Sequence, residues 1–189
     1  MSTIVAVTKG GRGWIAADTL TTFGDTRQSS AYEKSHDKIF RHGDSYIGVV
    51  GSAAHQIVLQ SVLAEHEDFR FDGRAQIFES FRRLHPLLKE QYFLNPKDDD
   101  EDPYESTRID ALIVNPAGVF AVFALREAFE YTRFWAVGSG SEIALGAMYA
   151  AYDNCDSGRD IARIAIEASA EFNVATALPL SIYSVELDV

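Results

Sequence analysis

Short apolar runs separated by turn residues fill the first third of the chain, a pattern typical of β-hairpins. The glycine-rich segment 9–13 separates one pair of runs, and the turn 42–44 separates a second pair. Between the pairs lies a polar stretch from Thr19 to Asp37, which we interpret as an irregular, partly extended loop. The sequence therefore predicts two hairpins, with strands at Thr3–Thr8, Trp14–Ala17, Lys38–Phe40 and Tyr46–Val50.

Helical spacing of apolar residues replaces this pattern after Val50. It predicts one helix that opens at Gly51-Ser52 and a second that contains Ile77–Tyr92, in which Pro86 should cause a kink or a restart. The next segment contains the acidic run Asp98–Asp102. We interpret this run as a solvated, mobile loop, because it lacks the glycine and the spacing of an EF-hand calcium loop.

Strand and helix patterns recur in the second half of the chain. The turn Asn115–Gly118 joins two strands, and Ser157 and Asp160 have the spacing of a capping box at the start of the last helix. The predicted elements are strands at Ile109–Val114, Val119–Leu125 and Phe134–Val137, helices at Glu142–Tyr152 and Arg159–Phe172, and a last strand at Leu180–Val185.

Antiparallel strand pairs and consecutive helix pairs indicate the fold class. The order ββ–ββ–αα–ββ–αα–β, with one further short strand, lacks the alternation of a parallel doubly wound sheet. Two sheets packed face to face, each covered by a helical pair, are the simplest way to bury this pattern. We therefore predict an α+β protein with a four-layer αββα sandwich. Because 189 residues suit one well-buried core and no linker or repeat is visible, residues 1–189 should form a single domain.

Charge and cysteine content limit the partners that we expect. A formal charge of −11 argues against nucleic acid or an anionic membrane, and no apolar run approaches the length of a membrane span. The single cysteine, Cys155, excludes an internal disulfide and suits a reducing cytoplasm, which is the predicted location. The histidines show no ligand spacing, so we predict neither a metal nor another cofactor.

The strongest candidate for chemistry is Ser2, which precedes the first apolar strand. Removal of Met1, which a small second residue permits, would leave a hydroxyl and a free α-amine on this one residue. An α-amine has a pKa of about 7.7–8.0 and can accept a proton near neutral pH. Ser2 would then supply both a nucleophile and its base.

Five short segments, each unspecific by itself, occur in the order and near the spacing of a known family. The segments are Ser2–Val7, Ile15–Asp18, Lys38–Phe40, Val49–Ala54 and Val137–Ser141. Together they resemble the proteasome β-subunit family, including the HslV peptidases and the bacterial proteasome homologues, over nearly the whole chain. This resemblance implies an N-terminal nucleophile hydrolase with an αββα fold.

The resemblance also implies a role for particular residues. Ser2 stands where the family has its threonine nucleophile, and Lys38 matches the lysine whose charge lowers the pKa of the neighbouring hydroxyl and amine. Asp18 matches the acid that pairs with this lysine. The backbone N–H of Gly51 matches the oxyanion donor, and Ser139 matches a hydroxyl that holds the terminal amine.

Two positions depart from the family pattern. Serine at position 2 lacks the methyl group that restricts χ1, so we expect weaker activity than with threonine. The helix before the last strand should end with an aspartate near the nucleophile, and the best match is Glu171, which is one methylene longer. By the same correspondence Thr21, Val49 and Ala53 line the cleft, which predicts a small to medium apolar substrate side chain.

The function implied by the resemblance is a self-compartmentalising peptidase that acts on peptides or unfolded proteins. We expect a homo-oligomeric double ring, with an ATP-dependent unfoldase as a candidate partner. Two alternatives stay open: an amidase of the same chemical class that acts on a small molecule, and a catalytically silent ring subunit in which Met1 is retained and Glu171 is misplaced.

Overall fold

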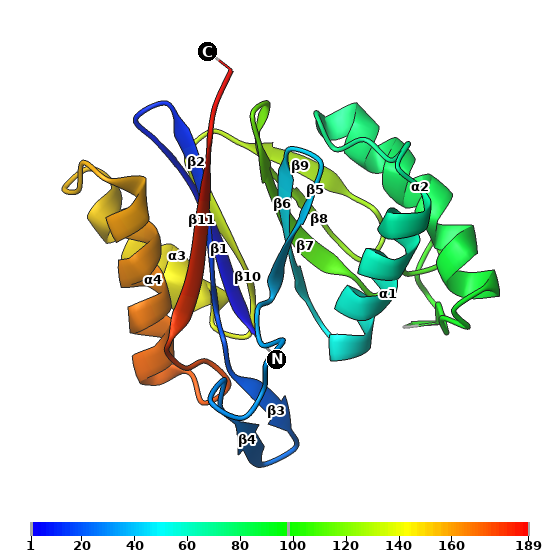
Figure 1. Ribbon diagram of the computed structural model, residues 1–189, viewed down its shortest axis with the longest axis horizontal. Helices are drawn as coiled ribbons and strands as arrows, with labels where there is room; N and C mark the ends of the chain where they lie inside the picture. The colour runs from blue at the N-terminus through cyan, green and yellow to red at the C-terminus, as the bar shows by residue number, and fades with distance from the viewer. Residues whose placement is uncertain (1, 98, 189) are drawn as a thin grey trace.

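In a computed structural model that describes residues 2–97 and 99–188, two antiparallel sheets lie face to face with two helices outside each (Figure 1). The first sheet contains β1 (Thr3–Lys9), β2 (Arg12–Asp18), β10 (Phe134–Gly138) and β11 (Leu180–Glu186), in the order β10-β1-β2-β11. The second contains β5 (Ile39–His42), β6 (Ser45–Val50), β7 (Asp110–Asn115), β8 (Gly118–Val122) and β9 (Ala128–Tyr131), in sequential order.

Helices α3 (Ser141–Tyr152) and α4 (Gly158–Phe172) cover the first sheet, and α1 (Ala53–Glu65) and α2 (Arg74–Glu90) cover the second (Figure 1). The predicted αββα sandwich is therefore confirmed. Within the described residues, the helices fall short of the length and apolar character that a membrane crossing requires.

Three apolar layers hold the sandwich together. Ile4 packs between the two sheets with Leu112, whereas the next residue, Val5, packs under α3 and α4 with Ile166. The third layer, which includes Phe81, lies between the second sheet and α1 and α2. Because successive side chains of a strand point to opposite faces, β1 is buried on both sides. The chain segment immediately before β1 is therefore attached to a strand in the centre of the core.

Several local predictions were wrong. The stretch from Thr19 to Asp37 is not wholly irregular, because it contains a small hairpin of β3 (Thr21–Phe23) and β4 (Thr26–Gln28). Strand β9 was missed, and β8 ends at Val122 since a tight turn follows, in which the Arg126 N–H donates to the Phe123 carbonyl at 2.8 Å.

The predicted helix signals had mixed outcomes. Helix α2 runs through Pro86 without a restart. Helix α1 begins as predicted, with the Ser52 side chain accepting a hydrogen bond from the Ala54 N–H at 3.3 Å. Helix α4 also begins near its predicted position, but the Ser157 side chain makes no capping hydrogen bond. The prediction of Met1 removal, and residue 98 of the acidic run, lie outside the described residues.

Candidate active site

Ser2 is held beside β10 at the point where β1 begins. Its carbonyl oxygen accepts a hydrogen bond from the Ser139 N–H at 2.8 Å, and Thr3 pairs with Gly138 in the sheet. Gly138 has φ +99°, and a Cβ atom at this position would lie 2.0 Å from the Ser2 carbonyl oxygen. Glycine is therefore required for this approach of two backbones. Ser2 is only 8% exposed, so its position is well defined by its surroundings.

Asp18, the last residue of β2, is a fully buried carboxylate with four hydrogen-bond donors. Oδ1 accepts from the Thr3 N–H at 2.9 Å and from the Lys38 ammonium at 2.7 Å. Oδ2 accepts from the backbone N–H groups of Leu20 at 3.0 Å and Ala177 at 3.3 Å. A buried charge is costly unless it is paired and hydrogen-bonded, and these donors meet that requirement. Asp18 thereby fixes the start of β1 relative to Lys38.

Lys38 lies immediately before β5 and is also buried. Its Nζ donates to Asp18 and to the Leu20 carbonyl oxygen, both at 2.7 Å. Burial lowers the pKa of Lys38 below its ordinary value of 10.5, and the charge and hydrogen bond of Asp18 oppose this decrease. The ammonium is therefore positioned by two acceptors, and it places a positive charge at the wall of the cleft described below.

Gly51 forms the turn between β6 and α1 and has φ +122°, a conformation that side chains rarely adopt. A Cβ atom here would lie 2.9 Å from Nδ1 of His55 and 3.5 Å from the Arg108 carbonyl oxygen. The N-terminus of α1 follows directly, and helix N-termini favour negative charge. This turn is thus suited to stabilise an oxyanion, provided that no side chain is added at Gly51.

A cleft of about 600 Å³ brings most of these groups together. Ser2, Lys38 and Gly51 line it, as do the three residues expected to contact substrate. Those three come from different elements, namely Thr21 from β3, Val49 from β6 and Ala53 from α1. A serine, a buried lysine and a glycine turn, which lie far apart in the sequence, therefore share one cavity.

Ser139 and Glu171 have different surroundings from each other. The Ser139 Oγ donates to the Ser2 carbonyl oxygen at 3.4 Å and to Oδ1 of Asn173 at 3.3 Å, and Nδ2 of Asn173 donates to the Ser139 carbonyl oxygen at 2.9 Å. Glu171 is exposed near the end of α4, and its side chain makes no hydrogen bond or ion pair within the described part of the chain. Asn173, two residues later, is the side chain that contacts this region.

Asn173 also contacts a pair of hydroxyl groups, those of Thr176 and of Thr3 at the start of β1. The Thr176 Oγ1 donates to Oδ1 of Asn173 at 3.2 Å and lies 2.6 Å from Oγ1 of Thr3. This network of neutral groups connects the segment after α4 with Thr3 and with Ser139, which contacts the Ser2 carbonyl oxygen. The sequence did not reveal it, because the family pattern indicates a carboxylate at this helix end. The available signal was the tendency of Asn side chains to bond to nearby backbone groups, as Oδ1 of Asn173 does by accepting from the Ala175 N–H at 3.0 Å.

Potential metal ligands do not gather in the described ranges, where no group of three or more His, Cys, Asp or Glu side chains is placed to hold an ion. Cys155 is half-buried and free of any disulfide.

Comparisons with known proteins identify similar solved structures. No protein-family model matches the chain, and no curated protein sequence does. Among solved structures, the chain is similar to Thiobacillus denitrificans BPH in complex with epoxomicin, with 42% sequence identity, a TM-score of 0.92, and coverage of 99% of this chain and 100% of that one. A second structure of T. denitrificans BPH shares 43% identity, with a TM-score of 0.93 and coverage of 98% of both chains.

A more distant neighbour shares the fold alone. The eukaryotic HslV from Trypanosoma brucei superposes with a TM-score of 0.70 at 20% identity, over 97% of this chain and 99% of that one. The family resemblance drawn from the sequence is thus confirmed at the levels of sequence and fold. The chain belongs to the bacterial proteasome homologues, which share the fold of the proteasome β-subunits and HslV.

Proposed function

We propose that this protein is a peptidase subunit that cleaves peptide bonds with Ser2 as its N-terminal nucleophile, once Met1 has been removed. The observation that carries the proposal is the single cleft lined by Ser2, the buried ammonium of Lys38 and the turn at Gly51. The similarity to a T. denitrificans protein solved in complex with epoxomicin supports a ligand-binding cleft in this family.

The reaction proposed is acyl transfer through an ester. The Ser2 Oγ attacks the peptide carbonyl carbon while its proton passes to the Ser2 α-amine, directly or through a water molecule. The proton then goes to the leaving amine as the peptide C–N bond breaks. In the second half, the α-amine takes a proton from water, the resulting hydroxide attacks the ester, and the proton returns to the Ser2 Oγ as the acid product leaves.

Each neighbouring group supports one part of this sequence. The ammonium of Lys38 favours the deprotonated hydroxyl and the neutral amine of Ser2, since a nearby positive charge lowers both pKa values. Asp18 holds Lys38, and the Gly51 N–H stabilises the negative oxygen of each tetrahedral intermediate. Ser139 and Asn173 position Ser2, with Asn173 in the place that the sequence led us to assign to Glu171.

The assembly proposed is a homo-oligomeric double ring in the cytoplasm that degrades peptides or unfolded proteins. Large apolar side chains are exposed on the α3–α4 layer and just after it, including Tyr149 (78% exposed), Phe172 (75%) and Val174 (83%). Exposed apolar groups in one layer favour contact with another subunit. An ATP-dependent unfoldase remains a candidate partner. Light scattering should give a mass corresponding to many subunits, and a monomer would contradict the ring.

Hydrolysis of fluorogenic peptides by the purified protein tests the catalytic proposal. The protein whose intact mass lacks Met1 should cleave peptides and should be blocked by epoxomicin, and Ser2→Ala should abolish cleavage without changing the assembly. Ser2→Thr is the matched variant, because it keeps the hydroxyl and restricts χ1, so its kcat should exceed that of the natural protein.

The same measurements separate the two competing functions. Retention of Met1 together with no cleavage by the natural protein would indicate a silent ring subunit. Removal of Met1 with hydrolysis of small amides but of no peptide would indicate an amidase, and either result would overturn the peptidase proposal.

A further inference from the structure

The cleft has an acidic wall in addition to the groups used for catalysis. Its lining includes the carboxylates of Glu33 and Asp37, both from the segment that links β4 to β5. Lys38 also lines the cleft, but its ammonium lies 2.7 Å from the buried carboxylate of Asp18. No other lysine or arginine lines the cavity in the described residues. The surface offered to a ligand therefore carries excess negative charge, which attracts cations.

Asp37 is a fixed anion within this wall. Its Oδ1 accepts from the Ile39 N–H at 3.0 Å, and its Oδ2 accepts from the hydroxyl of Tyr183 on β11. The hydrogen bond to Asp37, together with burial, raises the pKa of Tyr183 to about 12. Asp37 thus contributes charge to the cleft while its oxygens are engaged with the protein.

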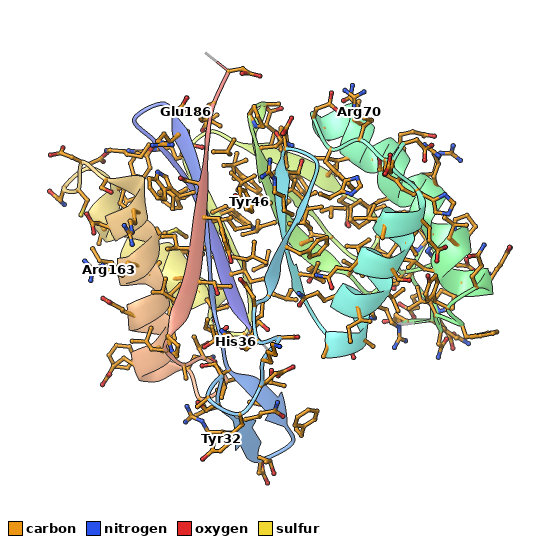
Figure 2. The ribbon with its side chains drawn as sticks, viewed as in Figure 1. Tyr32, His36, Tyr46, Arg70, Arg163 and Glu186 are labelled. Atoms are coloured by element: carbon orange, nitrogen blue, oxygen red, sulfur yellow. The ribbon has the colours of Figure 1, made fainter. Side chains whose placement is uncertain are left out.

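Glu33 is the carboxylate that can still bind a ligand. Its Oε2 accepts from Nε2 of Gln28 at 2.9 Å, whereas Oε1 accepts no hydrogen bond within the part of the chain that the structure describes. The Glu33 carbonyl oxygen lies 2.9 Å from Nδ1 of His36, which anchors the backbone of this residue. Figure 2 shows His36 and Tyr32 on the segment below the two sheets, on the side of the β3–β4 hairpin.

An apolar wall faces the same cavity. Val49, Ala53 and Ile57 line it from β6 and α1, and Ile57 is 67% exposed. Lysine and arginine side chains commonly pack their aliphatic stems on apolar surface while their charged ends reach a polar partner. The apolar wall could contact the aliphatic stem of a lysine or arginine, and the half-buried carboxylate of Glu33 could bind its charged end.

We propose that the cleft binds a lysine or arginine side chain of its substrate, with Glu33 as the specificity-determining residue. This inference rests on the proposed function for the identity of the substrate as a peptide, and it departs from the sequence-based prediction of a small to medium apolar side chain. Glu33 accepts a charge-assisted hydrogen bond from the substrate, which is stronger than a neutral one. Asp37 adds long-range attraction that salt weakens.

Binding to the Ser2→Ala variant tests the inference without any need for catalysis. A fluorescein-labelled peptide carries arginine, norleucine or glutamate at each position in turn, and anisotropy gives the dissociation constants. At one position or more, the arginine peptide should bind about tenfold more tightly than the norleucine peptide, and the glutamate peptide should bind most weakly. Adding Glu33→Gln should reduce the arginine-to-norleucine ratio to within about twofold.

Asp25→Asn is the matched control, because Asp25 is an exposed residue at the turn of the nearby β3–β4 hairpin and does not line the cleft. It removes the same formal charge and should leave the arginine-to-norleucine ratio unchanged. Norleucine binding as tightly as arginine at every position would overturn the inference, as would an arginine preference that survives Glu33→Gln.

Hydrolysis of the same peptides by the natural protein separates this inference from the proposed function. Selective binding of arginine peptides without any hydrolysis would contradict the peptidase function and leave the acidic subsite supported. Rapid hydrolysis with a preference for norleucine would support the peptidase function and overturn the subsite.

Discussion

The two sheets contribute differently to the cleft. The first sheet fixes Ser2 at the start of β1, Asp18 at the end of β2 and Ser139 just after β10. The second supplies Lys38 immediately before β5 and Gly51 immediately after β6. The first sheet thus holds the proposed nucleophile, whereas the second brings the positive charge and the proposed oxyanion donor. Their alignment is as important to the proposed chemistry as either sheet alone.

The Asp18–Lys38 pair is a direct link between the two contributions, so breaking it should have the largest effect. Asp18→Asn removes the charge that compensates a buried ammonium, and such a change costs about 3–5 kcal/mol. We expect a loss of this size in the free energy of unfolding, measured by denaturant titration. Peptide hydrolysis should decrease by at least about a thousandfold, because Lys38 loses its position and its charge.

Asp153→Asn is the control for this variant, since Asp153 pairs with Arg133 on the surface, where its side chain is 77% exposed. Exposed pairs contribute about 0–1 kcal/mol, so stability and hydrolysis should hardly change. Equal effects of the two substitutions would show that the buried link has no special role.

Gly51→Ala should disable the proposed oxyanion donor of the second sheet while sparing Lys38 and the first sheet. The new Cβ would meet His55 at 2.9 Å, and φ +122° is strained for alanine, so the turn must move. Loss of one oxyanion donor reduces kcat by about 100–1000-fold, and we expect an effect in this range. Steady-state kinetics give kcat of the variant. A small electrophile should still label Ser2 in this variant, because the first sheet is unchanged.

The matched glycine is Gly146 in α3, where an added Cβ meets nothing within 4 Å. Gly146→Ala should stabilise the protein by about 0.5–1 kcal/mol and leave kcat unchanged. A normal kcat in Gly51→Ala would exclude this turn as the oxyanion donor.

Asn173→Ala should have a smaller effect that is confined to the first sheet. It removes hydrogen bonds with Ser139 and Thr176, each with a net contribution of about 0.5–1.5 kcal/mol. We expect kcat to fall by about tenfold. The binding of peptides to the apolar wall formed by Val49, Ala53 and Ile57 should change little. Glu171→Gln, two residues earlier, should be without effect. A loss of activity in Glu171→Gln but not in Asn173→Ala would instead support Glu171, the residue that the sequence led us to assign.

Features formed within one stretch of chain could be predicted from the sequence, whereas contacts between distant segments could not. The hairpins around residues 9–13 and 42–44 depend on local turns and alternation, which are visible in one stretch of chain. The short strand β9 and the β3–β4 hairpin lack such a run, so they were missed. Ser2 was a candidate from its place before the first strand, whereas Asp18 and Lys38 were assigned only by the family resemblance. The contact of Asn173 with Ser139 joins residues 34 positions apart, and no local pattern indicates it.

The pH dependence should show the smallest, graded effect. The folded-state pKa of Lys38 is lowered below 10.5 by burial, while the unfolded chain keeps the ordinary value. Between these two values the unfolded state binds more protons, so the contribution of Lys38 to stability increases as pH rises. Hydrolysis should decrease over the same interval, because the ammonium charge is lost. Parallel measurement of kcat and denaturant midpoints across the alkaline range tests these opposite trends.

Mapping the site of modification tests the central claim most directly, namely that a freed Ser2 lies in the cleft with the Lys38 ammonium. The protein purified from cells is treated with a serine-reactive phosphonofluoridate, digested and sequenced by mass spectrometry, with and without prior epoxomicin. We predict an N-terminal peptide that starts at Ser2 and carries the label on that residue, with labelling prevented by epoxomicin. An N-terminal peptide that retains Met1, or a label spread over other serines with Ser2 unmodified, would contradict the account.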